Sequence, residues 1–256
     1  MRSDTDLRMP LSAHLEELRA RLIKSLLAIG AGFLVVYNWA DLLFAVITRP
    51  LLRIGAGHAM FIGTGVAEAF YTKLKVSFIA GIFLASPVVL YQVWRFVAPG
   101  LYIHERRYAV GFVTFGTACF FLGAAFCYEV IFTFGYAFFL GEYQSMGVNA
   151  TLRISEYVTF SATLLLVFGS IFELPVLAFF LARLGVITAE HLVASWRYSI
   201  VGIFVIAAVL TPPDVASQLL MAGPLLVLYG ISIGVAHVAQ RLHRAATPIE
   251  SEKATP

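Results

Sequence analysis

The chain has 256 residues, of which 60% are hydrophobic and only 13% are charged. A soluble domain is typically about 45–50% apolar and about 25% charged, so this composition excludes an ordinary soluble protein and indicates a polytopic membrane domain. The formal net charge of +3 is small, and the positions of the charges are more informative than their sum.

The first structural signal after a polar start is an amphipathic helix. Pro10 and Ser12 are typical of a helix start, with Ser12 as the capping residue. Charged residues, including Glu17 and Arg21, occupy the other faces. We expect a short helix that lies on the membrane surface and leads into the first span. Its apolar face consists of residues at helical spacing, namely Leu11, Leu15, Leu18 and Leu22.

Six apolar segments are predicted to be transmembrane helices, which makes the fold class an all-α polytopic membrane protein. A helix needs about 20 apolar residues to cross a bilayer, so the third span is longer than required, and we expect shorter fifth and sixth spans. One transmembrane domain is predicted over residues 1–245, with a disordered cytoplasmic tail over residues 246–256. The expected spans are residues 22–44, 76–94, 108–140, 157–182, 198–210 and 215–238.

The basic residues predict the orientation of the spans. Six spans put both termini on the same side of the membrane. If that side is the cytoplasm, most of the 18 Lys and Arg residues are internal, as the positive-inside rule requires. The basic residues that remain outside are Arg49, Arg53, Lys73, Lys75 and Arg153. Both termini are therefore expected to be cytoplasmic.

Residues 91–107 form the most informative stretch between two spans. It opens with aromatic residues that favour a membrane–water interface, breaks at Pro99-Gly100 and closes in a charge cluster. Glu105 is the only carboxylate in this stretch. We interpret the stretch as a structured loop on the cytoplasmic face.

Glu17 and Glu105 each have a plain structural interpretation. Glu17 precedes Arg21 by four residues, which favours a surface salt bridge of only about 0.3–0.5 kcal/mol. Glu105 has Arg106 and Arg107 beside it. Together, however, two carboxylates on the cytoplasmic face form a receptor for a cationic peptide, and arginine is their natural ligand because guanidinium binds carboxylate bidentately.

Three polar residues in or beside the later spans also have two interpretations. Glu173 lies within the fourth span, two residues before Pro175, and is either a functional group or a polar tie between helices. Gln218 either serves a site or makes an interhelical hydrogen bond, and Asp214 either serves a site or caps the sixth span. Glu129 in the third span is expected to lie near the external interface and to extend towards water.

Sequence signals for catalysis are missing. There is no H-E-x-x-H and no Walker-type loop, and the six histidines have no metal-ligand spacing. The sequence predicts a protein that is not an enzyme, with no catalytic residue, metal, cofactor or nucleic-acid partner.

Four motifs together resemble the TatC family, the multi-spanning core of the twin-arginine protein translocase. They occur in the family's order and extend over about residues 10 to 240. The motifs are residues 14–22 (HLEELRARL), residues 91–107, Phe172-Glu173-Leu174-Pro175, and Thr211-Pro212-Pro213-Asp214 with Gln218.

The resemblance implies a signal-peptide receptor in the cell membrane and the core of a translocase that exports folded proteins, driven by the proton-motive force. It implies that Glu17 and Glu105 bind the arginine pair of the signal peptide, with Arg19 and Phe96 around the same site. It also implies self-association in a receptor oligomer and no ATPase activity. Glu173 matches the family's intramembrane glutamate. Single-span partners of the TatA/TatB type are implied to dock at Thr211, Pro212, Pro213, Asp214 and Gln218.

The match has two departures and suggests one physical mechanism. Glu129 is not a motif residue, and Thr133 stands where related chains often have proline. The sixteen residues between Arg197 and Asp214, which include the fifth span, would be about 24 Å long as a helix, against a bilayer core of about 30 Å. We hypothesise that local thinning, with Glu173 on a concave polar face, weakens the membrane where cargo crosses.

Three other classes of protein remain as alternatives. A secondary transporter would use Glu173 and Glu129 as coupling carboxylates, but such proteins usually contain repeated halves, and no repeat is visible here. An intramembrane hydrolase is the second alternative. A structural scaffold does not need the pairing of Glu17 with Glu105.

Overall fold

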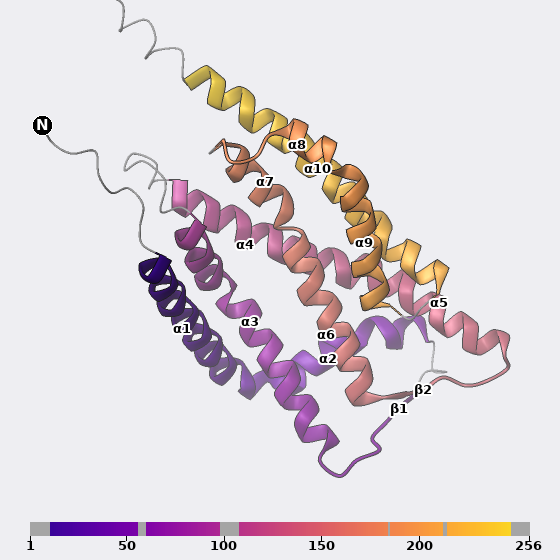
Figure 1. The fold of residues 1–256 in the computed structure, drawn as a ribbon. Coiled ribbons are helices and arrows are strands. Elements are labelled where there is room, and N and C mark those ends of the chain that lie inside the picture. Colours follow the sequence, from indigo (N-terminus) through magenta and orange to yellow (C-terminus); the bar gives the residue numbers. More distant parts are fainter. Residues whose placement is uncertain (1–10, 56–59, 98–107, 184, 212–213, 247–256) are drawn as a thin grey trace, which may run out of the picture.

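The computed structural model describes residues 11–55, 60–97, 108–183, 185–211 and 214–246 (Figure 1). Helices dominate these residues, and five of them are long and apolar enough to cross a membrane. This agrees with the expected all-α membrane protein, and the structure differs from the prediction mainly in where helices begin, break and end.

The first difference concerns the amphipathic segment, which is not a separate helix. Helix α1 runs without interruption from Leu11 to Val36. The segment contains no proline, so nothing breaks the hydrogen-bond ladder between its polar start and its apolar end. The first predicted span therefore ends at Val36 instead of Phe44, where a short 3-10 turn, Tyr37–Trp39, begins.

Helix α2, Ala40–Ile54, replaces the end of the predicted first span and the loop after it. It contains Pro50, which cannot donate a hydrogen bond to the carbonyl of Val46. The Tyr128 hydroxyl donates to that carbonyl at 2.8 Å. A tertiary contact thus satisfies the group that proline leaves free, and the helix continues through it.

Two short strands join segments that are far apart in the sequence. Strand β1, Met60–Ile62, pairs in parallel with β2, Thr151–Arg153. Helix α3, Glu68–Val97, follows β1 and begins before the expected start of the second span. No strand was predicted, because a three-residue pairing has no recognisable hydrophobic alternation.

The third span is one long helical segment with a local irregularity. Helix α4, Tyr108–Phe126, continues through a π-helical segment, Cys127–Ile131, into α5, Phe132–Ser145. The apolar part, Gly111–Ser145, has 35 residues, or about 52 Å of helix, which exceeds a bilayer core of about 30 Å.

The fourth predicted span is broken into two helices. Helix α6, Ile154–Ile171, ends in a turn at residues 172–173, and α7, Leu174–Arg183, follows it. Pro175 lacks the N–H that would bond to the carbonyl of Ile171, which explains the break. The chain then forms the short α8, Ala189–Ala194, the apolar α9, Trp196–Leu210, and α10, Val215–Ala246. Helix α9 is short, as expected, but α10 has 32 residues, so the expectation of a short sixth helix was wrong.

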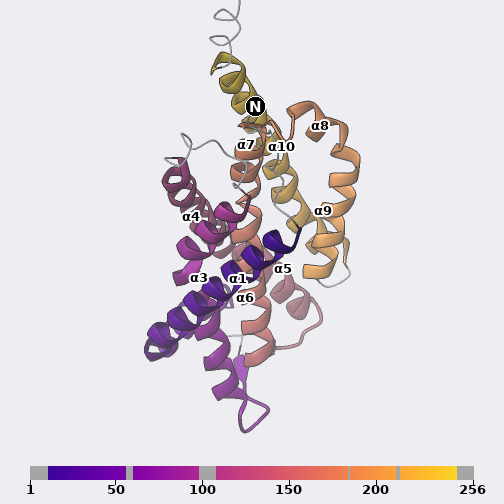
Figure 2. The ribbon, with the colours of Figure 1, turned by 60° about the vertical axis from the view of Figure 1, so that its left-hand side comes forward.

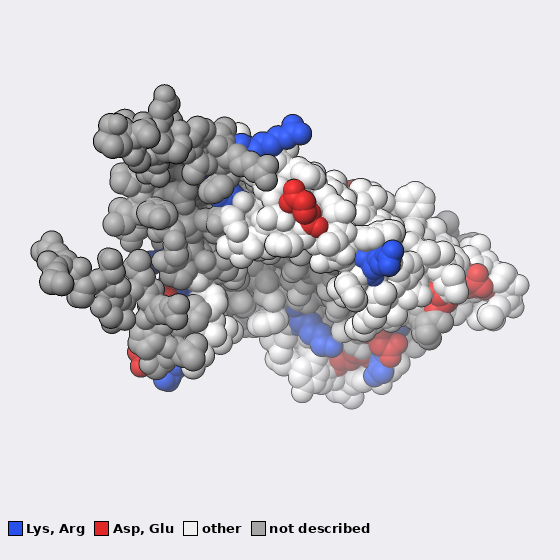
Figure 3. Space-filling model, turned by 45° about the horizontal axis from the view of Figure 1, so that its top comes forward, with Lys and Arg blue, Asp and Glu red and all other residues white. Residues whose placement is uncertain are grey.

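The helices form an elongated bundle with two distinct ends. Helix α1 packs along α3, and α10 packs against α7 and α9. The start of α1 and the end of α10 lie towards the same end of the bundle, whereas α2, β1 and β2 lie at the other, which we call the sheet end (Figures 1 and 2). Between the ends, the described surface carries few charged side chains in the view of Figure 3.

The largest buried side chains join the sheet end to the centre of the bundle. Leu51 of α2, Phe132 of α5, Phe168 of α6 and Met221 of α10 belong to one core cluster. Helices α1 and α3 instead meet backbone to backbone, since an added Cβ at Gly32 would lie 2.6 Å from the carbonyl oxygen of Gly81.

Candidate functional site

Glu17 forms the predicted ion pair with Arg21, one turn further along α1. Both side chains are partly enclosed, with 26% and 11% of their surface exposed, respectively. Arg21 also donates through Nη1 to the carbonyl of Gln92 in α3, at 3.4 Å. The pair is therefore more than an intrahelical surface bridge, because it ties the Glu17 turn of α1 to the last turns of α3.

The structure describes two of the three other residues predicted around Glu17. Arg19 is exposed on α1, and Phe96 is half-buried near the end of α3. The end of α3 is anchored by the buried Trp94, whose ring packs on Phe112 of α4. Glu105 lies outside the described residues. The structure therefore places the Glu17 turn of α1 next to the last turns of α3. The position of Glu105 stays a prediction.

Glu173 occupies the break between α6 and α7. Its side chain is buried, with 6% of the residue exposed. No described residue forms a hydrogen bond with either carboxylate oxygen, so the expected polar tie between helices is absent from this part of the chain. The carboxylate lies against Gly116 of α4, where an added Cβ would be 3.0 Å from Oε2. Because Gly116 has no side chain, the Glu173 carboxylate has room at this position.

Asp214 and Gln218 have the structural roles that their positions suggested. Asp214 caps α10, accepting through Oδ1 from the backbone N–H of Ser217 at 2.7 Å, and its Oδ2 accepts from the Ser217 hydroxyl. These hydrogen bonds from Ser217 hold the pKa of Asp214 below its usual range. Gln218 donates through Nε2 to the carbonyl of Phe204 in α9, at 3.1 Å. Asp214 therefore stabilises the start of α10, and Gln218 fastens α10 to α9.

The turn between these helices is described only at its edges. Thr211 is buried, and its hydroxyl donates to the carbonyl of Ala207 at 2.9 Å. Pro212 and Pro213 lie outside the described residues. This turn is at the sheet end of the molecule, so the structure does not bring it together with Glu17 (Figure 1).

Substituting Gln218 with leucine is expected to loosen α9. The change removes the hydrogen bond to Phe204, and such interhelical bonds contribute about 0.6–1.7 kcal/mol in membrane proteins. We expect a similar loss in the free energy of unfolding, measured by thermal denaturation in detergent. Gln144→Leu on the exposed end of α5 is the control, and equal stability of the two variants would contradict the role of this bond.

Glu68 is a structural residue to which the sequence pattern assigned no role. Oε2 accepts from the backbone N–H groups of Thr64 and Gly65, at 2.6 and 3.1 Å, and from the Thr64 hydroxyl. Oε1 accepts from the backbone N–H and the hydroxyl of Ser155, at 3.1 and 2.6 Å. Arg153 adds an ion pair at 3.4 Å. One carboxylate therefore holds the starts of α3 and α6 together. An acid within a short, otherwise apolar segment was the sequence signal that could have identified it.

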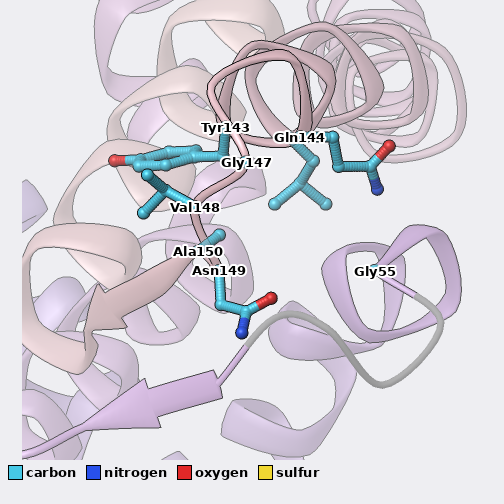
Figure 4. Close-up of a pocket in the computed structure, with 8 residues that line it drawn as sticks. Gly55, Tyr143, Gln144, Gly147, Val148, Asn149 and Ala150 are labelled. Carbon is cyan, nitrogen blue, oxygen red and sulfur yellow. The ribbon is translucent and has the colours of Figure 1, made fainter.

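A pocket of about 430 Å³ lies at the sheet end. Tyr143 and Gln144 line it from α5, Gly55 from the end of α2, and residues 147–150 from the connection to β2 (Figure 4). No Asp, Glu, Lys, Arg or His is among the described lining residues. Among the described residues, no three His, Cys, Asp or Glu side chains are grouped to hold a metal ion.

Comparisons with known proteins agree with this architecture. Residues 13–224 match the family model described as "Sec-independent protein translocase protein (TatC)". The chain is 44% identical to the protein of that name from Desulforapulum autotrophicum, over 88% of this chain and 83% of the relative. It is 42% identical to the one from Azotobacter chroococcum, over 95% and 94% of the two chains.

A solved structure gives the same result in three dimensions. The crystal structure described as "Twin Arginine Translocase Receptor- TatC" superposes with a TM-score of 0.81 at 37% identity, covering 88% of this chain and 99% of the other. Family model, sequence relatives and fold all agree with the resemblance that the four motifs carried. The chain therefore belongs to the TatC family of Sec-independent protein translocase proteins, which are membrane transport proteins and not enzymes.

Proposed function

We propose that this protein is the signal-peptide receptor and core of a translocase that exports folded proteins with twin-arginine signal peptides, driven by the proton-motive force. Glu17 and Glu105 bind the arginine pair, and Arg19 and Phe96 complete the site. The observation that carries this proposal is the contact of Arg21 with both Glu17 and the carbonyl of Gln92. It keeps Glu17 beside the helix whose end leads into the segment that contains Glu105.

The chemistry of the Glu17 side chain supports this role. Arg21 bonds to Oε1 of Glu17, whereas Oε2 has no hydrogen-bond partner among the described residues. Oε2 is buried and keeps unused hydrogen-bond acceptor capacity, which a peptide guanidinium that reaches it would satisfy. Because a carboxylate accepts several strong charge-assisted hydrogen bonds, Glu17 can keep Arg21 and bind a peptide arginine as well.

We propose six spans in one domain, residues 1–245, with both termini in the cytoplasm and residues 246–256 as a tail. The common location of the start of α1 and the end of α10 supports an even number of crossings (Figure 1). Five long apolar helices supply five spans, and the apolar α9 supplies the sixth. At 15 residues α9 is about 22 Å long, so the bilayer must thin around it.

We propose that TatA/TatB-type single-span partners dock at the turn from Thr211 to Asp214 and at Gln218, and that copies of the chain associate in a receptor oligomer. Helix α9 supports this docking site because it packs mainly on α10 and leaves Val201, Val205 and Val209 exposed. The cap at Asp214 stabilises the start of α10, and the bond from Gln218 holds α9 in place for a partner helix. Glu173 is the buried polar group of the membrane face.

The test is crosslinking of a twin-arginine signal peptide to membranes that contain the protein. Glu17→Ala and Glu105→Ala should each reduce crosslinking roughly tenfold to a hundredfold, because a hydrogen bond to a charged group contributes about 1.5–3 kcal/mol. Glu16→Ala is the control, since Glu16 is exposed on the adjacent position of α1. The protein level of each variant is measured alongside.

Two results would change the proposal. Crosslinking that survives in the Glu17→Ala/Glu105→Ala double variant would move the recognition site elsewhere on a receptor of the same family. Absence of crosslinking in the unaltered protein would argue against a receptor, and uptake of small solutes into vesicles would then test the secondary-transporter alternative.

A further inference from the structure

Helix α2 presents two arginines on its outward face at the sheet end. Leu42, Val46, Arg49 and Arg53 recur at i, i+4, i+7 and i+11, so they form one helical face, and all four side chains are exposed. The opposite face is buried against the bundle through Leu51. The outward face is therefore apolar in its first half and cationic in its second.

Two tyrosines hold α2 in this orientation. Tyr128 donates to the carbonyl of Val46, and Tyr157 donates to the carbonyl of Ile47, each at 2.8 Å. Because these bonds attach α2 to the long helices on either side of it, the helix cannot rotate its arginines towards the core. The two guanidiniums stay at the surface, one helical turn apart.

The other described basic residues at the sheet end already have partners. Lys73 pairs with Asp41 at 2.9 Å, Lys75 donates to the Thr159 hydroxyl at 2.9 Å, and Arg153 pairs with Glu68 and Glu156. Neither Arg49 nor Arg53 forms an ion pair with an acid in the described part of the chain. Glu129, Arg49 and Arg53 all lie close enough to the Tyr128 hydroxyl to interact with it electrostatically. Glu129 is nevertheless exposed, and within the described residues it forms no ion pair with either arginine.

We propose that Arg49 and Arg53 bind the phosphate of an anionic phospholipid at the membrane surface, with Leu42 and Val46 against its acyl chains. Guanidinium forms bidentate hydrogen bonds to phosphate oxygens, and two of them one turn apart on a helix surround a single phosphate. An amphipathic helix with arginines beside exposed apolar residues is typical of helices that lie in the interface of a bilayer. The site uses neither Glu17 nor Glu173, so it is separate from signal-peptide recognition.

The experiment measures how phosphatidylglycerol, added to the protein in phosphatidylcholine nanodiscs, raises the melting temperature. A basic residue near an anionic surface contributes about 1 kcal/mol to membrane binding. The Arg49→Gln/Arg53→Gln variant should therefore require about tenfold to thirtyfold more phosphatidylglycerol for the same rise in melting temperature. Lys73→Gln/Lys75→Gln removes the same charge from paired residues at the same end and should change the requirement by less than about twofold. Melting in phosphatidylcholine alone establishes that each variant is folded.

Further variants separate the lipid from other anions. Glu129→Gln should lower the phosphatidylglycerol requirement, because it removes a negative charge near the arginines. Leu42→Asn/Val46→Asn should raise it, because the acyl chains lose their contacts. The proposal is overturned if the double arginine variant responds to phosphatidylglycerol as the unaltered protein does. It is also overturned if inorganic phosphate alone produces the whole stabilisation, or if the lysine control loses as much as the arginine variant.

Discussion

Replacing Gly81 with alanine is expected to lower the free energy of unfolding by about 1–3 kcal/mol, the usual cost of overpacking. An added Cβ at position 81 would lie 2.6 Å from the nitrogen and 2.9 Å from the Cα of Phe33 in α1. Both neighbours are backbone atoms, so no side-chain rotation relieves the clash and the two helices must move apart. Thermal denaturation in detergent, followed by circular dichroism, measures the loss.

A second glycine in the same helix pair, Gly30, is a matched control, because its replacement with alanine should not lower the free energy of unfolding. An added Cβ at Gly30 of α1 meets nothing within 4 Å, and alanine is favoured over glycine in a helix by up to about 1 kcal/mol. Gly30→Ala should therefore be neutral or stabilising. Signal-peptide crosslinking should fall with Gly81→Ala as well, since separation of α1 from α3 breaks the contact of Arg21 with Gln92. Equal stability of the two alanine variants would show that the close helix crossing contributes nothing.

Removing the Glu68 carboxylate is expected to lower the melting temperature by several degrees and to release the sheet end. Glu68→Ala leaves the N–H groups of Thr64, Gly65 and Ser155 without their acceptor, and buried donors without a partner are costly. The starts of α3 and α6 would then lose their connection, so the pairing of β1 with β2 should weaken.

A disulfide across the two strands reports this release directly. Met60 and Thr151 are register partners, so cysteines at both positions should oxidise readily in the unaltered background and more slowly with Glu68→Ala. Glu156→Ala is the control, because Glu156 is exposed and, in the described part of the chain, its side chain bonds to Arg153 alone, at 3.4 Å. If Glu68→Ala matched this control in melting temperature and in oxidation rate, Glu68 would be a passive surface acid.

Much of the architecture followed from hydrophobicity and from residues with strong local preferences. Apolar runs of the required length predicted long apolar helices, and the structure has five that are long and apolar enough to cross a membrane. Asp214 after two prolines predicted the cap of α10, and the spacing of Glu17 and Arg21 predicted their ion pair. The four motifs predicted the TatC family, which the family model confirms.

Other features were missed because their causes lie in distant parts of the chain. Pro50 suggested a loop, yet Tyr128 supplies the hydrogen bond that lets α2 continue. Glu68 appeared as an isolated acid, and its partner Ser155 is 87 residues away. Arg21 was expected to pair only with Glu17, and its second partner, Gln92, is on another helix.

The sequence by itself determined the class of protein, most of its long apolar helices and the family, because burial in lipid and helix capping depend on composition and on neighbours within one or two turns. Only the tertiary structure decided where α1 ends, that α2 is a helix, how Glu68 joins α3 to α6, and that Gly116 makes room for Glu173. These features depend on which backbone groups and side chains meet across helices. No periodicity or propensity in a single segment contains that information.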